Sequence, residues 1–212
     1  MLRFDHIAIG CATLEQGAAY MAVRTGLTVP IGGEHPLMGT HNLVMSMGED
    51  TFFEVIAVNP SAAKPMRPRW FGLDDARLTN PRPHSWILNS DDLETDLATA
   101  KSLGIDLGSP TTLTRGDMTW RFAVREDGAI PLEGAAPMIM EWSEMSIHPA
   151  TKMADLGARI SSITLATPHA STLNKLLNTL GDGNMPIEIF NSPDTNLTTT
   201  LALIDGREAV LD

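Results

Sequence analysis

Two histidines and two glutamates occupy matching places in short apolar segments of the sequence. His6 lies in "DHIAIG" and Glu54 in "FFEVIA", while His84 opens "HSWIL" and Glu141 lies in "IMEWS". A carboxylate inside an apolar segment is costly to bury unless it is paired or bound to a metal ion. Two imidazoles and two carboxylates could together bind one divalent cation and leave positions open for substrate or water. The alternative is that each histidine is an ordinary packed residue at the start of a strand.

The segments that carry these residues recur in units of the same kind. Residues 1–62 have the pattern of a strand, a helix and three strands, and after a proline-rich connection at 63–82 the same order returns at 83–148. A third start at 159–212 repeats the first strand and helix, but has Ser162 in the place of the histidine. A repeat of such units predicts two βαβββ modules and a partial third module.

These residues and segments resemble the vicinal oxygen chelate superfamily, the group of glyoxalases, bleomycin-resistance proteins and extradiol dioxygenases. The segment "GGEHPLMGTHN" is similar to a loop of its glyoxalase-like domain branch. The resemblance is good over residues 4–148 and weak over residues 159–212. It implies an α+β fold in which paired βαβββ modules form a curled mixed sheet around a cleft, with the partial third module added.

The resemblance also implies a set of metal ligands. In the superfamily the first and last strands of each module hold the metal, so the ligands here would be His6, Glu54, His84 and Glu141. Strict alignment of the two modules puts Ser85 rather than His84 in the ligand position, and a slip by one residue turns a side chain to the other face of a strand. A bulge near Pro81–Pro83 would restore His84, so both residues stay open as the ligand.

Further candidate residues lie in the quoted loop and in the connection between the modules. His35 and His41 would line the cleft as substrate contacts, with His41 as a general base, or they would only pack the loop. If His41 faces the cleft, alternation along the strand turns Asn42 to the other face. Arg69 and Trp70 could hold a substrate carboxylate at the rim, or they belong to an ordinary solvated connection.

The function that the resemblance implies is a divalent-metal-dependent lyase or isomerase of a small oxygenated metabolite. The metal could be zinc, nickel, cobalt, manganese or iron; it would act as a Lewis acid, and Glu141 or Glu54 would move the proton. One alternative is a metal-free protein that binds or sequesters a small molecule. Another is a non-haem iron dioxygenase that uses His6, His84 and Glu141.

Composition argues against several other classes of protein. Of the 212 residues, 43% are hydrophobic and 19% are charged, which is typical of a globular domain. A net charge of −11 disfavours nucleic acid and anionic membranes as partners, because like charges repel. Cys11 is the only cysteine, and no signal peptide or membrane-spanning run is visible. We therefore expect a cytoplasmic protein with a small-molecule partner, and a homodimer stays open.

Overall fold

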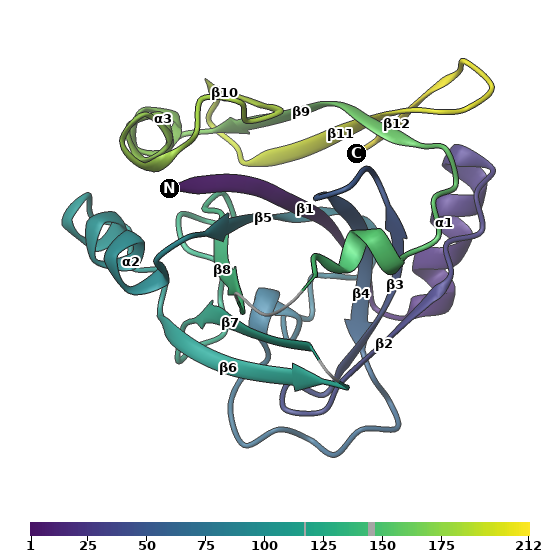
Figure 1. The fold of residues 1–212 in the computed structure, drawn as a ribbon, viewed down its shortest axis with the longest axis horizontal. Coiled ribbons are helices and arrows are strands. Elements are labelled where there is room, and N and C mark those ends of the chain that lie inside the picture. Colours follow the sequence, from purple (N-terminus) through teal and green to yellow (C-terminus); the bar gives the residue numbers. More distant parts are fainter. Residues whose placement is uncertain (117, 144–146) are drawn as a thin grey trace.

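The first part of the chain forms one half of a strongly curled sheet (Figure 1). The computed structural model describes residues 1–116, 118–143 and 147–212. The first elements follow the predicted order, with β1 (Leu2–Gly10), α1 (Leu14–Thr25), β2 (Ile31–His35), β3 (Thr40–Ser46) and β4 (Phe52–Val58). α1 begins where the Thr13 side chain accepts a hydrogen bond from the Gln16 amide, and it ends at Gly26, whose φ of 78° favours glycine.

The second part of the chain repeats this order and forms the other half of the sheet. A connection that contains a 3₁₀ turn (Trp70–Gly72) leads to β5 (Arg82–Ser90), α2 (Leu93–Ser102), β6 (Ser109–Arg115), β7 (Met118–Val124) and β8 (Met138–Trp142). α2 begins where the Asp92 carboxylate accepts a hydrogen bond of 3.1 Å from the Thr95 amide. A second 3₁₀ turn (Pro149–Lys152) follows β8.

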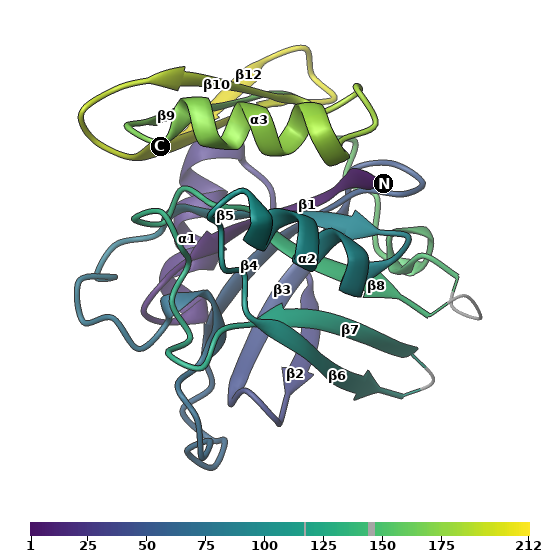
Figure 2. The ribbon, with the colours of Figure 1, turned by 90° about the vertical axis from the view of Figure 1, so that its left-hand side faces the viewer.

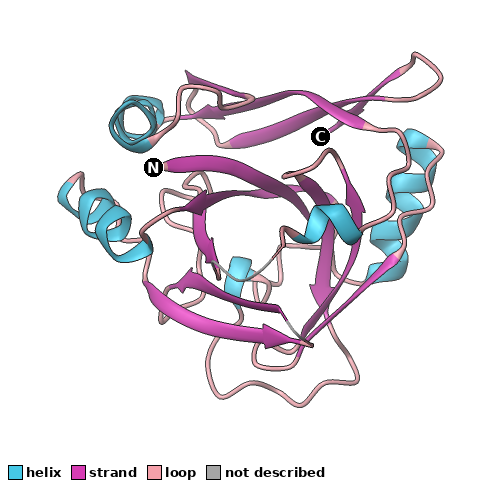
Figure 3. Ribbon diagram, in the orientation of Figure 1, coloured by secondary structure: helices cyan, strands magenta, loops and turns pink. Residues whose placement is uncertain are grey.

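The two halves join into one eight-stranded sheet of order β2-β3-β4-β1-β5-β8-β7-β6. β1 pairs antiparallel with β5 in the middle, and in each half the first strand pairs parallel with the last. The sheet curls until its edge strands, β2 and β6, contact each other, while α1 and α2 stay on its outer side (Figures 2 and 3). This arrangement confirms the predicted α+β fold of paired modules around a curled mixed sheet.

The last part of the chain forms a separate four-stranded sheet. Its elements are β9 (Arg159–Thr167), α3 (Ala170–Leu180), β10 (Ile187–Asn191), β11 (Asn196–Ala202) and β12 (Glu208–Leu211). Their order along the chain is again a strand, a helix and three strands. The order in space differs, because β10-β9-β11-β12 places the first strand inside the sheet, whereas β1 lies at the edge of its own half. The repeat in sequence is therefore not a repeat in topology.

This second sheet lies on the outer side of β1 and β5 and shares their core (Figure 1). The Asp182 amide donates a hydrogen bond of 3.1 Å to the Leu2 carbonyl, and Arg24 of α1 pairs with Asp212 at 2.6 Å. Leu211 of β12 is fully buried in the same hydrophobic cluster as Leu2. The second sheet is therefore part of the folded body. None of the helices in the described ranges is long and apolar enough to cross a bilayer.

We expect Leu211→Ala to lower the free energy of unfolding of the whole chain by about 2–4 kcal/mol, because it leaves a cavity in the shared core. Val210→Ala is the matched control on the same strand, since the Val210 side chain is 48% exposed. Urea unfolding followed by tryptophan fluorescence checks this, because all four tryptophans lie in residues 70–142. An unchanged fluorescence transition in Leu211→Ala would show that the second sheet folds independently.

Candidate functional site

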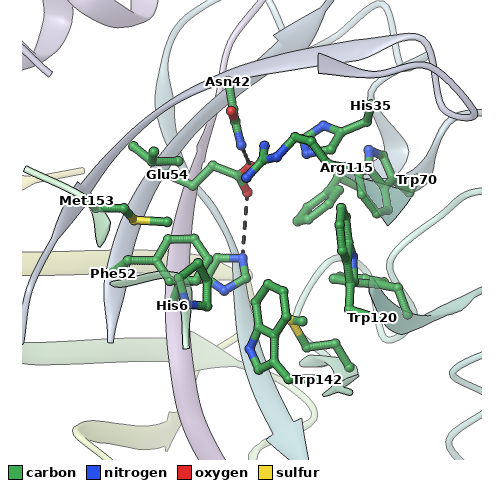
Figure 4. Close-up of a pocket in the computed structure, with 15 residues that line it drawn as sticks. His6, His35, Asn42, Phe52, Glu54, Trp70, Arg115, Trp120, Trp142 and Met153 are labelled. Atoms are coloured by element: carbon green, nitrogen blue, oxygen red, sulfur yellow. Dashed lines mark hydrogen bonds and ion pairs between the residues drawn. The ribbon is translucent and has the colours of Figure 1, made fainter. Parts of the chain in front are cut away.

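A cavity of about 40 Å³ lies inside the curled sheet, with walls from both halves (Figure 4). Four polar side chains come from the first half, and they are His6 of β1, His35 of β2, Asn42 of β3 and Glu54 of β4. Aromatic side chains form much of the remaining wall, and they are Phe52, Trp70, Phe71, Trp120, Phe122 and Trp142. The cavity thus joins a charged wall to an apolar, aromatic wall.

Asp5, His6 and Glu54 form a chain of charged groups in the polar wall. Nδ1 of His6 lies 2.5 Å from Oδ1 of Asp5, and Nε2 of the same ring lies 3.6 Å from Oε2 of Glu54. Nδ2 of Asn42 donates a hydrogen bond of 2.6 Å to the other oxygen of Glu54. The Phe52 ring stacks on the His6 ring at a centroid distance of 4.0 Å. His6 and Glu54 are each only 4% exposed.

Strand register explains why these residues meet. In the parallel β1–β4 pair, His6 lies opposite Phe52 and Ala8 lies opposite Glu54, so alternation puts all four on the inner face. A register shift in the β1–β5 pair falls immediately before His6. Such an irregularity re-aims side chains, and it lets the consecutive residues Asp5 and His6 contact each other.

The electrostatics make His6 a buried cation between two carboxylates. Burial alone would raise the pKa of Asp5, but hydrogen bonds with His148 and His6 lower it to about 2. Burial alone would lower the pKa of His6, but Asp5 and Glu54 raise it to about 9. Burial also opposes ionisation of Glu54, yet His6 and Asn42 hold its pKa below the usual range. At neutral pH the chain is therefore carboxylate, imidazolium and carboxylate.

His35 is the opposite case, a neutral imidazole in the same cavity. Burial lowers its pKa to about 4. Its Nδ1 lies 3.1 Å from Oγ1 of Thr40, and that oxygen accepts a hydrogen bond of 3.2 Å from Nε1 of Trp70. Thr40, the first residue of β3, thus links the His35 imidazole to the Trp70 indole.

Arg115 brings a cation into the cavity from the second half of the sheet. It is the last residue of β6, and its side chain reaches over Gly33 of β2. A Cβ at Gly33 would lie 2.9 Å from Cδ and Nη1 of Arg115, so the arginine side chain packs closely on the backbone of β2. The guanidinium carbon lies 6.0 Å from the centroid of the Trp120 ring. Nη1 is buried, and no described atom accepts a hydrogen bond from it.

The structure places His84 away from the cavity, against the prediction that it is a metal ligand. Ser85 lies opposite Ala8 and therefore shares the inner face with His6, and the register shift between Ala8 and Ile9 leaves His84 without an opposite residue on β1. Nε2 of His84 lies 2.6 Å from the Phe71 carbonyl oxygen, and the His84 ring packs against Gly10. Ser85 is fully buried but does not line the cavity.

Glu141 also lies outside the cavity, so its predicted roles as metal ligand and base are wrong for this geometry. Met140 and Trp142 face the cavity, and the residue between them points the opposite way. There Glu141 pairs with Arg121, which also binds Glu94. The ion pair with Arg121 therefore explains why a carboxylate is found in this apolar segment.

Of the four expected substrate contacts, His35 and Trp70 line the cavity and the other two do not. Asn42 faces the cavity, so the adjacent His41 lies on the other face of β3. Arg69 pairs with Asp74 at 2.6 Å.

Asp5, Asn42 and Arg115 are the site residues that sequence reasoning missed. Asp5 carries a signal, because it is a second charged residue beside His6 in an apolar segment. Asn42 faces the cavity, whereas the alternation expected from His41 puts it on the other face of the strand. Arg115 has no local signal, because only the closure of the sheet brings β6 next to β2.

The donor set does not fit a divalent metal site. Across residues 1–116, 118–143 and 147–212, no group of three or more His, Cys, Asp or Glu side chains is placed to hold a metal ion. The second half of the sheet, which was expected to supply two ligands, supplies Trp120, Trp142 and the cation of Arg115 instead.

Comparison with known proteins agrees with this fold. The family described as glyoxalase-like domain matches residues 4–181. A hypothetical protein from Staphylococcus aureus superposes with a TM-score of 0.64 at 14% identity, covering 99% of this chain and 98% of that chain. Methylmalonyl-CoA epimerase from Mycobacterium tuberculosis superposes with a TM-score of 0.42 at 16% identity, covering 66% of this chain and 85% of that chain. An epimerase from Streptomyces coelicolor gives 0.42 at 14% identity, covering 69% and 96%. No curated protein matches the chain.

We expect Asp5→Asn to lower the pKa of His6, because the variant removes one carboxylate and keeps the burial that disfavours the cation. An NMR titration of the His6 imidazole measures this shift. The folded pKa of about 9 lies above the ordinary 6.5, so stabilisation by the cation is complete below pH 6.5 and is lost as the pH rises to 9. Asp5→Asn should flatten this loss of stability.

Asp75→Asn is the matched control for this change, because Asp75 is exposed and its carboxylate pairs with Arg77. It should leave the His6 titration unchanged. A His6 pKa that is the same in Asp5→Asn and in the unmodified protein would contradict the assignment of the buried cation.

Proposed function

The chain belongs to the glyoxalase-like domain family of the vicinal oxygen chelate superfamily, and from this premise we propose that it is a metal-independent isomerase or lyase of a small oxygenated metabolite. The substrate has a carbonyl group and a hydrogen on the adjacent carbon. The chain's own side chains move that proton. The observation that carries the proposal is the pair of His6 and Glu54 at the cavity wall.

The separation within this pair leaves a place for a substrate oxygen. At 3.6 Å, Nε2 of His6 and Oε2 of Glu54 are farther apart than in a normal N–H···O hydrogen bond. A carbonyl oxygen that accepts the Nε2 proton would replace Glu54 as the partner of His6. Glu54 would then lose the neighbour that lowers its pKa, and it would become a stronger base at the moment of substrate binding.

The proton transfers balance within the site. Glu54 removes the proton from the carbon next to the carbonyl, and the electrons of that C–H bond form a carbon–carbon double bond. The carbonyl oxygen receives the proton from Nε2 of His6, which gives an enol. The proton on Glu54 then passes to Nε2 of His6 and restores the starting pair. Asp5 holds the ring in place through Nδ1 during these steps.

A second candidate is a metal-free protein that only binds a small molecule. One observation favours it: the hydrogen bond from Asn42 keeps Glu54 a weak base unless a ligand displaces His6. The metal-dependent lyase and the iron dioxygenase have less support, since His84 and Glu141 bind other partners.

We expect the protein to accelerate exchange of the C3 hydrogens of phenylpyruvate in D₂O, measured by proton NMR. This compound is a planar probe with a carbonyl group and an acidic C–H bond. Glu54→Gln should slow the exchange by about 100-fold or more, because it removes the base. Glu141→Gln is the matched control on the outer surface and should exchange at the original rate. Equal rates for Glu54→Gln and the unmodified protein would contradict the proposal.

Metal analysis separates the proposal from the metal-dependent alternatives. After dialysis against zinc, nickel, cobalt, manganese or iron salts and then against buffer, we expect less than one equivalent of bound metal, because only His6 and Glu54 of the four expected ligands face the cavity. Exchange of phenylpyruvate should survive treatment with EDTA. One equivalent of metal whose removal abolishes exchange would contradict metal independence.

A further inference from the structure

The cavity holds one cation that the proposed proton transfers do not use, on Arg115. We propose that Arg115 and His35 bind a carboxylate of the substrate, so that the site takes 2-oxo acids with a flat apolar side chain. In this arrangement the carboxylate meets Arg115 and the adjacent keto oxygen meets His6. The inference rests on the proposed function and names the substrate class of the same cavity.

The unpaired nitrogen of Arg115 is the first argument. Nη1 is buried, and among the residues that the structure describes no acceptor binds it. Within residues 1–116, 118–143 and 147–212, no carboxylate lies within ion-pair distance of Arg115, although Glu54 is near enough to oppose the effect of burial on its pKa. Leaving a buried charged donor without a partner is unfavourable, and a carboxylate is its strongest common acceptor. A carboxylate of a bound ligand would supply the missing acceptor for Nη1 of Arg115.

The second argument is the proton position that the neighbours of His35 favour. Nε1 of Trp70 can only donate, so the Thr40 hydroxyl accepts from it. The hydrogen of that hydroxyl is then best placed on Nδ1 of His35, 3.1 Å away. A neutral imidazole that accepts at Nδ1 carries its hydrogen on Nε2. His35 therefore offers a neutral donor to the cavity, beside the cation of Arg115 (Figure 4).

The aromatic wall supplies the third argument, which concerns the rest of the substrate. The rings of Trp120 and Trp142 lie 5.7 Å apart, and Phe52 faces the cavity from the other half. Such surfaces favour a flat apolar group. The cavity volume of about 40 Å³ is small, but Met140 and Met153 also line it, and unbranched methionine side chains repack easily around a ligand.

The positions of the charges orient the substrate. His6 and Arg115 both offer N–H groups, and Glu54 lies near both (Figure 4). Two neighbouring oxygens, one from the keto group and one from the carboxylate, match these two donors. The C–H bond on the carbon next to the keto group then lies beside Glu54, which removes its proton. The side-chain cations of His6 and Arg115 would thus bind the two adjacent oxygens of the substrate.

Calorimetric titration of two matched probes tests the inference without depending on turnover. Phenylpyruvate carries the carboxylate, whereas phenylacetone has a methyl group in its place and keeps the same ketone. We expect Arg115→Gln to weaken phenylpyruvate binding at least tenfold and to leave phenylacetone binding unchanged. Arg115→Lys should lose less affinity, because it keeps the charge. Arg125→Gln is the control, since Arg125 pairs with Asp127 outside the cavity.

Each outcome decides between the two proposals. If phenylpyruvate does not bind, or if Arg115→Gln binds it as tightly as the unmodified protein, the inference is overturned. The same holds if Arg115→Gln weakens both probes equally, which is the result expected from a distorted cavity. If phenylpyruvate binds through Arg115 but its C3 hydrogens do not exchange, the carboxylate site stands and the proposed reaction fails.

Discussion

The site depends on a buried imidazolium held between two carboxylates. Charges removed from water are tolerated only when they are paired and when their remaining lone pairs have donors. Here Asp5 also accepts a hydrogen bond of 2.8 Å from Nε1 of Trp142, and it lies 3.2 Å from Nε2 of His148, while Asn42 binds Glu54. These partners come from both halves of the sheet. The charged chain is therefore complete only when both halves of the sheet are in place.

The four-stranded sheet covers the outer face of the strand that carries His6. The outward-facing Ile7 and Ile9 of β1 are fully buried, although strand alternation would otherwise leave them on an exposed surface. From Asp5 to Gly10 the strand that carries His6 is thus buried on both faces. A strand packed on both sides holds its side chains in a fixed register, and a preorganised ion pair needs such a support.

The fold could be predicted from the sequence because its signals are local. Each unit shows its strand and helix periods and its turn residues in order along the chain. The site was harder, because it depends on which face each strand presents, and one residue of register reverses that face. His6 and Glu54 line the cavity, whereas His84 and Glu141 do not line it and bind other partners. Met140 and Trp142 beside Glu141 suit a core as well as a cavity wall, so hydrophobicity alone could not fix the face.

Arg115 could not be predicted from the sequence, since its contact with the first half exists only in the closed sheet. Its presence also explains why the metal ligands are missing. His6 and Arg115 carry two positive charges that match the negative charges of Asp5 and Glu54. A divalent ion bound here would require His6 to lose a proton that its neighbours hold up to a pKa of about 9, and it would still leave an uncompensated charge of about one unit. The charge balance of the cavity therefore agrees both with the presence of Arg115 and with the absence of His84 and Glu141 from its lining.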